Sequence, residues 1–144
     1  MADIAAQILL VEDDPGDEMM AQEAFADDQL VSRLHVARDG EEALDFLYRR
    51  GSHADAPRPD FVLLDLNLPR VDGREVLRTI KADPSIASIP VVILTTSSAV
   101  EDIVACYSAH TNAYITKPAG YHDFVDVVRQ VNQFWMDTVR LPKR

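Results

Sequence analysis

Carboxylates that follow two separate apolar segments are the first residues of this chain whose types and spacing suggest chemistry. Glu12 and Asp13 come directly after the apolar residues 7–11, and Asp65 comes directly after residues 61–64. Carboxylates that share a partly dry cleft repel one another unless one is protonated or a cation lies between them. Oxygen ligands with room for water suit a hard divalent ion. We therefore expect these side chains to bind Mg²⁺.

A hydroxyl and an amine follow two further apolar segments. Thr95 ends the apolar residues 90–95, and Lys117 follows residues 113–116. A phosphoryl group in transfer is stabilised when a metal ion, a lysine and a hydroxyl contact its equatorial oxygens while a carboxylate attacks the phosphorus. Together with a metal, these side chains favour phosphoryl chemistry.

Asp65 is the better candidate for the attacking carboxylate. It stands alone after its segment, whereas Glu12 and Asp13 form a pair better suited to holding a metal. A structural explanation also exists, because aspartate is common where loops begin and acidic residues often cap helices. A cap needs one acidic residue, and Asp14 before Pro15 fits that role. The cap therefore leaves the preceding acidic pair unexplained.

The segments before these residues are typical of buried β-strands, since they are short, apolar and rich in Val, Ile and Leu. A fifth segment alternates more and is typical of an edge strand. The predicted strands are residues 7–11, 32–37, 61–64, 90–95 and 113–116. Helical spacing of apolar residues predicts helices at about residues 15–28, 41–50, 74–82, 100–107 and 124–135. Gly51 is expected to end the second helix, and Asp72-Gly73 is expected to form a turn before the third.

Strand and helix alternate strictly, which predicts an α/β fold with a central parallel sheet and helices on both faces. A chain of 144 residues that is 47% hydrophobic suits one domain with a substantial core. In such sheets ligands bind beyond the carboxyl ends of the strands. We therefore expect one site that contains Glu12, Asp13, Asp65, Thr95 and Lys117.

Composition excludes several classes of function. A net charge of −10 without a basic cluster argues against a nucleic-acid binder. No apolar run approaches the roughly 20 residues that span a bilayer, so we expect a soluble cytoplasmic protein. One cysteine, Cys106, and four histidines without ligand spacing give no support to a disulfide, zinc or haem site. Asp17, Asp27 and Asp28 are expected to lie on a solvated face.

Four motifs occur in order within residues 7–118: VEDD, LLDLNLP-x-x-DG, VVILTTS and YITKP. This set resembles the receiver domain of two-component response regulators. The resemblance implies a flavodoxin-like (βα)5 fold with strand order 2-1-3-4-5. It also implies a single receiver domain over residues 1–144, with a core at about 7–138 and a C-terminal tail at 139–144.

The resemblance implies roles for the acidic residues and the residue two places after Asp65. Asp65 becomes the phosphoacceptor that takes a phosphoryl group from a histidine kinase. Asp13 becomes a direct Mg²⁺ ligand, Glu12 its acidic partner, and Asn67 the donor of a backbone carbonyl to the metal. The chain would act as a signalling switch with its own phosphotransfer and slow autodephosphorylation, and not as an enzyme with an external product.

The resemblance also implies roles for residues at the last two strands. Thr95 becomes a switch hydroxyl that moves toward the phosphoryl group, and Tyr114 an aromatic switch residue whose position reports activation. Lys117 becomes the lysine that pairs with the phosphoryl group. Pro118 is expected to follow a cis peptide bond, as in the family.

Two stretches resemble a narrower group, the stand-alone regulators paired with bacterial phytochromes. They are APRPDFVLLDLNLPRVDGREVLRTIK and the ending FWMDTVRLP. The resemblance implies a phytochrome-type sensor kinase as partner and no output domain. A signal would then act through a change in dimerisation or partner binding.

An apolar strip near the C-terminus suggests a contact surface, because exposed apolar patches often mark interfaces. We expect a homodimer built from the fourth helix, the fifth strand, the fifth helix and the tail. The residues expected there are Val100, Val104, Tyr107, Phe134 and Trp135.

Three alternatives stay open. A phosphatase with an aspartyl nucleophile usually has a second acid two residues later, where this chain has Asn67. An FMN-binding module needs backbone donors after the first strand, where the acidic residues would repel phosphate. A receiver that acts only as a scaffold would need no phosphorylation, although every group for that reaction is present.

Overall fold

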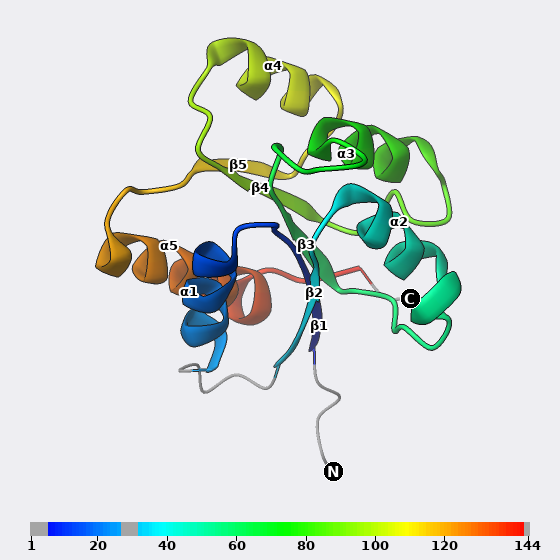
Figure 1. Ribbon diagram of the computed structural model, residues 1–144, viewed down its shortest axis with the longest axis horizontal. Helices are drawn as coiled ribbons and strands as arrows, with labels where there is room; N and C mark the ends of the chain where they lie inside the picture. Colours follow the sequence, from blue (N-terminus) through cyan, green and yellow to red (C-terminus); the bar gives the residue numbers. More distant parts are fainter. Residues whose placement is uncertain (1–5, 27–31, 143–144) are drawn as a thin grey trace.

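Five parallel strands form the centre of the molecule in a computed structural model that describes residues 6–26 and 32–142 (Figure 1). The strands are β1 (Ala6–Val11), β2 (Ser32–Ala37), β3 (Phe61–Leu64), β4 (Val91–Thr95) and β5 (Ala113–Thr116). Their order in the sheet is β2-β1-β3-β4-β5, and every neighbouring pair is parallel. The predicted fold class and strand order are therefore confirmed.

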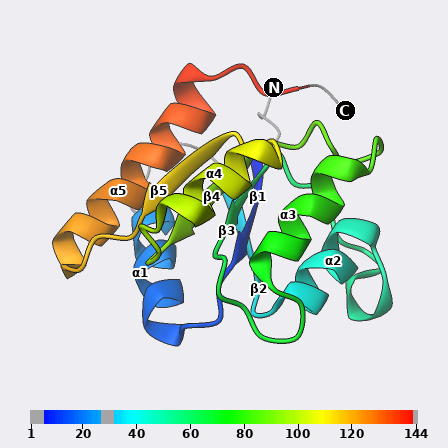
Figure 2. The same cartoon turned by 90° about the horizontal axis from the view of Figure 1, so that it is seen from above.

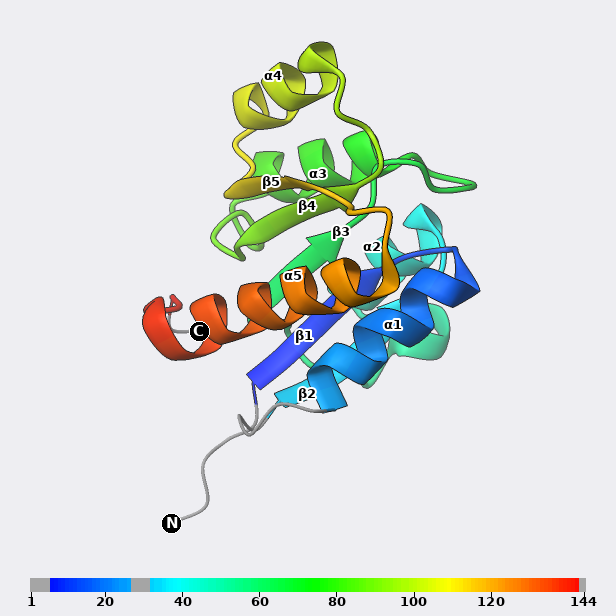
Figure 3. The same ribbon diagram turned by 90° about the vertical axis from the view of Figure 1, so that its left-hand side faces the viewer.

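Helices cover both faces of the sheet. They are α1 (Pro15–Ala26), α2 (Gly40–Tyr48), α3 (Gly73–Ala82), α4 (Val100–Ser108) and α5 (Tyr121–Gln133). Two short helical turns, Gly51–His53 and Phe134–Thr138, follow α2 and α5. Figure 3 shows α1 and α5 on one face and α2, α3 and α4 on the other. No helix within residues 6–26 and 32–142 is both long and apolar enough to cross a bilayer.

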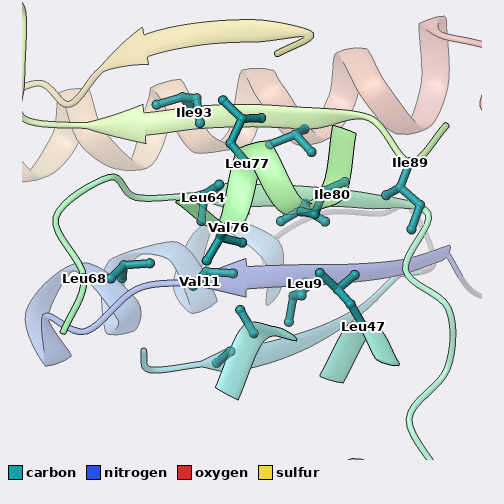
Figure 4. Close-up of a cluster of buried hydrophobic side chains, with 14 of the residues drawn as sticks. Leu9, Val11, Leu47, Leu64, Leu68, Val76, Leu77, Ile80, Ile89 and Ile93 are labelled. Atoms are coloured by element: carbon teal, nitrogen blue, oxygen red, sulfur yellow. The ribbon is translucent and has the colours of Figure 1, made fainter. Parts of the chain in front are cut away.

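Alternating residues of the central strands divide the core into two layers, because successive side chains of a strand point to opposite faces. Leu9 and Val11 of β1 pack with α2 and α3, where Val76, Leu77 and Ile80 are fully buried or nearly so (Figure 4). Ile8 and Leu10 of the same strand pack against α1 and α5; the buried helix residues there are Ala21, Ala24, Phe25, Phe124, Val125, Val128 and Val131. In β3, Val62 and Leu64 join the first layer and Phe61 and Leu63 the second, so both β1 and β3 are inner strands with apolar residues on each face.

Helix ends follow local hydrogen bonds. As predicted, Asp14 caps α1, since its carboxylate accepts from the Gly16 amide at 2.8 Å and the Asp17 amide at 3.3 Å. The prediction that Gly51 ends α2 is wrong. The left-handed residue is Arg49, with φ of 56°, and the next amide donates to the Asp45 carbonyl at 2.8 Å. That bond closes the helix two residues earlier.

Candidate functional site

The carboxyl ends of β1 and β3 lie at one edge of the sheet, where the β1–α1 and β3–α3 loops run side by side (Figure 2). Asp65 directly follows β3, and its amide donates to the Val11 carbonyl at 3.1 Å. Its side chain is buried. The sheet therefore fixes the backbone of Asp65 while the side chain faces the loop residues that follow β1.

Close backbone packing holds the loop after Asp65. The Gly73 amide, at the start of α3, donates to the Leu66 carbonyl at 2.8 Å. A Cβ atom at Gly73 would lie 2.1 Å from the Asp65 carbonyl oxygen, so only glycine fits there. Asp72 caps α3 through the Arg74 amide at 3.1 Å. Asp72-Gly73 is thus a turn and helix start, as predicted, and it also braces the backbone of Asp65.

Three carboxylates meet at this edge. One oxygen each from Glu12, Asp13 and Asp65 lies within 4.8 Å of the others. Glu12 is buried and Asp13 is exposed. Burial raises the pKa of Glu12 to about 7, against the opposing effect of its hydrogen bond with Lys117. The donor set, all oxygen with one open side, fits a hard divalent cation that would relieve the repulsion.

Lys117 is surrounded by carboxylates. Its ammonium donates to Glu12 at 2.6 Å, to Asp17 at 2.8 Å and to Asp65 at 3.0 Å. The side chain is only 4% exposed. Burial alone would lower the pKa of Lys117, but the hydrogen bonds with Asp17 and Glu12 outweigh it and raise that pKa above its usual value. The ammonium is therefore the counter-ion of the acidic residues in this structure.

Asp17 is a site residue that sequence reasoning missed. The expectation of a solvated face is wrong for Asp17, because its carboxylate accepts from the Lys117 ammonium at 2.8 Å. The residue lies in the first turn of α1, three positions after its cap. That spacing was visible in the sequence, but which way the first turn points was not. Asp27 and Asp28 lie outside the described residues.

Thr95, at the end of β4, is fully buried. Within the described part of the chain, its hydroxyl oxygen has no hydrogen-bond partner. Its carbonyl accepts from the Lys117 amide at 2.7 Å, which ties the ends of β4 and β5 together. A buried hydroxyl without a partner is uncommon and costly. It is a donor that has no acceptor among residues 6–26 and 32–142.

Asn67, Tyr114 and Pro118 differ in how they relate to this cluster. The Asn67 side chain is exposed, and the Asn67 backbone amide donates to an Asp65 carboxylate oxygen at 3.4 Å. Tyr114 is partly buried, and its hydroxyl donates to the Ser97 carbonyl at 2.9 Å. The expected cis bond before Pro118 is wrong, since the bond is trans. Trans is the lower-energy form of an X–Pro bond by about 0.5–1 kcal/mol.

A polar network that the sequence did not reveal joins α3, α4 and the β4–α4 loop. Asp102 of α4 accepts from Arg74 of α3 at 2.9 Å and from the Ser97 hydroxyl at 2.6 Å. These two bonds lower the pKa of Asp102, the Ser97 bond having the larger effect. Because Tyr114 bonds to the same Ser97, the network connects β5 to α4. Residues on different helices pair here, and no short-range spacing could have shown it.

The predicted interface residues divide into two kinds. On α4, Val100, Val104 and Tyr107 are 69%, 57% and 50% exposed, and their i, i+4, i+7 spacing places them along one side of the helix. Phe134, in the turn after α5, is also exposed. Trp135 is partly buried and its ring stacks on Phe61, with 6.2 Å between centroids. The α4 residues thus form an apolar surface, which we call the α4 stripe, whereas Trp135 packs mainly on the core.

Comparisons with known proteins agree with this site. The chain is 44% identical over 135 residues to response regulator Rcp1 of Synechocystis, covering 94% of this chain and 92% of Rcp1. It is 41% identical over 136 residues to the protein called "Probable methanogenesis regulatory protein FilR2" of Methanothrix harundinacea, covering 94% of this chain and 86% of that protein.

Solved structures show the same similarity. The phosphorylated cyanobacterial phytochrome response regulator RcpA superposes with a TM-score of 0.94 at 44% identity, covering 97% of this chain and all of that one. The Mn²⁺-bound form of Rcp1 gives a TM-score of 0.93 at 43% identity, covering 96% and 99%. Residues 8–129, which contain every acidic residue of the site as well as Thr95 and Lys117, match the response regulator receiver domain. The chain therefore belongs to the response regulator receiver domain family.

Proposed function

We propose that this protein is a single-domain switch in which Asp65 accepts a phosphoryl group from a histidine kinase. The observation that supports this most directly is the single buried carboxylate at the end of β3, 3.0 Å from the Lys117 ammonium and grouped with Glu12 and Asp13. An Asp65 oxygen would attack phosphorus, and the phosphorus–nitrogen bond of the phosphohistidine would break toward nitrogen. Later attack by water would release phosphate and restore the carboxylate.

The surrounding side chains suit that transfer. Glu12, Asp13 and Asp65, with the Asn67 carbonyl, would hold Mg²⁺, which supplies positive charge to the phosphoryl oxygens. Lys117 would pair with one of those oxygens. The Thr95 hydroxyl, which has no acceptor among the described residues, would donate to another. Each of these contacts strengthens as charge develops on the group in transfer.

The output we propose is a change in binding. Thr95 lies two residues before Ser97, whose carbonyl holds Tyr114 and whose hydroxyl holds Asp102 of α4. A shift of Thr95 toward a phosphoryl group would pull on this loop and so on α4. The α4 stripe, together with Phe134 and the nearby Trp135, would then form or release a homodimer or a partner contact.

Phosphorylation is tested by treating the protein with acetyl phosphate and Mg²⁺ and measuring its intact mass. We expect a gain of one phosphoryl mass, lost in Asp65→Asn and kept in Asp55→Asn, which changes an exposed carboxylate in the loop before β3. A gain that survives Asp65→Asn would refute the assignment. Steady turnover of a generic phosphate ester would favour the phosphatase alternative instead.

A phytochrome-type kinase is the partner we propose, because Rcp1 and RcpA are each 44% identical to this chain. RcpA is a phytochrome response regulator. The test compares phosphotransfer from a phytochrome histidine kinase with transfer from an unrelated histidine kinase at equal concentration. We expect faster transfer from the phytochrome kinase. Faster transfer from the unrelated kinase would exclude a phytochrome kinase as the preferred donor.

A further inference from the structure

The Asp17 carboxylate lies beside the proposed metal site but outside it. Its oxygen is 2.8 Å from the Lys117 ammonium. Among the described residues, the carboxylates close enough to share a cation are Glu12, Asp13 and Asp65, so Asp17 contacts the lysine without belonging to that group. Asp17 is therefore the one partner of Lys117 in this structure that a metal would leave in place.

Lys117 and a divalent cation compete for the same oxygens. The ammonium has three N–H donors, and in this structure all three are used, by Glu12, Asp17 and Asp65. A cation held by Glu12 and Asp65 would withdraw these carboxylates from the ammonium. Because the lysine side chain is only 4% exposed, water cannot readily replace them. A buried charge that loses its partners is strongly unfavourable.

We propose that Asp17 is a positioning residue that holds the Lys117 ammonium when a divalent cation takes Glu12 and Asp65. This inference rests on the proposed function, since it concerns the same metal and lysine. The Asp17 backbone is fixed by the cap of α1, where the Asp14 carboxylate accepts from its amide at 3.3 Å. Its side chain is 21% exposed, so the carboxylate keeps contact with water while it bonds to the lysine.

Asp17 thus favours metal binding by giving the displaced ammonium a partner. Without it, Lys117 would stay with Glu12 and Asp65 and oppose the metal more strongly. The effect should require the lysine. If Asp17 acted only as a nearby negative charge, its removal would weaken metal binding equally whether or not Lys117 were present.

The test is a double-mutant cycle on Mg²⁺ affinity, measured by calorimetry without any phosphate donor. Asp17→Asn should weaken Mg²⁺ binding about tenfold in the wild-type background, the size of one charge-assisted hydrogen bond. In a Lys117→Met background the same substitution should change affinity less than about twofold, as expected for a partly exposed charge. Lys117→Gln provides a second background if the methionine variant does not fold.

Glu18→Gln is the matched control, because it removes the next carboxylate of α1, which bonds to Arg38 and not to Lys117. It should leave Mg²⁺ affinity within about twofold of wild type. Equal effects of Asp17→Asn in both backgrounds, or no effect in either, would overturn the positioning role alone. A wild-type protein that fails to bind Mg²⁺ would overturn the proposed function as well, so the two failures are distinguishable.

Discussion

The raised pKa of Glu12 predicts that metal binding weakens as pH falls through neutrality. Burial raises this pKa to about 7, although the hydrogen bond with Lys117 acts in the opposite direction. A metal needs the ionised carboxylate, so protons and metal compete at Glu12. Lower pH therefore adds the proton and weakens metal binding, and higher pH removes the proton and strengthens metal binding.

The expected change in Mg²⁺ affinity follows from the same pKa of Glu12. With a pKa of about 7, about nine-tenths of Glu12 is ionised at pH 8 and about one-tenth at pH 6. Apparent Mg²⁺ affinity should therefore fall about tenfold over that range, or about 1.4 kcal/mol. An ordinary exposed glutamate, with a pKa of about 4.3, would stay ionised throughout and give almost no change.

Calorimetry at pH 6, 7 and 8, in two buffers with different ionisation enthalpies, measures both the affinity and the protons released. We expect the release of close to one proton per Mg²⁺ at pH 6 and of almost none at pH 8. Glu12→Gln is the matched control, since it keeps the side-chain length and removes the titration, and its affinity should vary little between these pH values. If the Mg²⁺ affinity of the wild-type protein does not change with pH, burial does not raise the pKa of Glu12 as inferred.

Two further predictions concern α4. Arg74→Gln and Asp102→Asn should each lower the free energy of unfolding. A double-mutant cycle in urea should show a coupling of about 0.5–1 kcal/mol for this partly exposed pair. Strictly additive effects would mean that the pair does not hold α4 to α3. Val104→Asp should reduce self-association without changing the melting temperature by more than a few degrees, because the side chain is 57% exposed. Sedimentation with and without acetyl phosphate measures this, and unchanged association would exclude the α4 stripe from the interface.

The inner strands could be predicted closely because they are buried on both faces. In β3 every residue is buried, so the sequence shows an unbroken apolar run with the bounds that the structure has, Phe61–Leu64. β5 and β2 were also predicted at their observed bounds. Helix ends were less predictable. Arg49 adopts a left-handed conformation that glycine would favour, because the bond to the Asp45 carbonyl stabilises it.

The site was predictable where topology alone places a residue. Side chains that directly follow parallel strands must share one edge, and Glu12, Asp65 and Lys117 do meet there. Asp17 and Asp102 were not predictable, because their contacts depend on how a helix is rotated about its axis. The sequence shows which residues share a helix face, but not which residue of another element that face meets.

Helices α3 and α4 are attached to the sheet in different ways, and this difference favours α4 over α3 as the helix that would move if Asp65 were phosphorylated. Helix α3 is held by Val76, Leu77 and Ile80, which are all buried in the core. Moving α3 would expose apolar surface, at a free-energy cost of roughly 25 cal/mol for each Å² exposed. On α4, Cys106 is the one buried residue, and the helix lies over the β5 edge of the sheet (Figures 1 and 3).

Polar contacts supply much of the attachment of α4, through Asp102 with Arg74 and Ser97 and through the Tyr114 bond to the same serine. Such hydrogen bonds contribute about 1 kcal/mol each and can exchange partners at little net cost. Charge added at Asp65 would act on Thr95 and thus on Ser97, two residues later in the chain. The element with the weakest apolar anchorage among the described helices is therefore the one that carries the exposed α4 stripe. A small shift at the carboxyl ends of the strands could thus alter the proposed binding surface without disturbing the core.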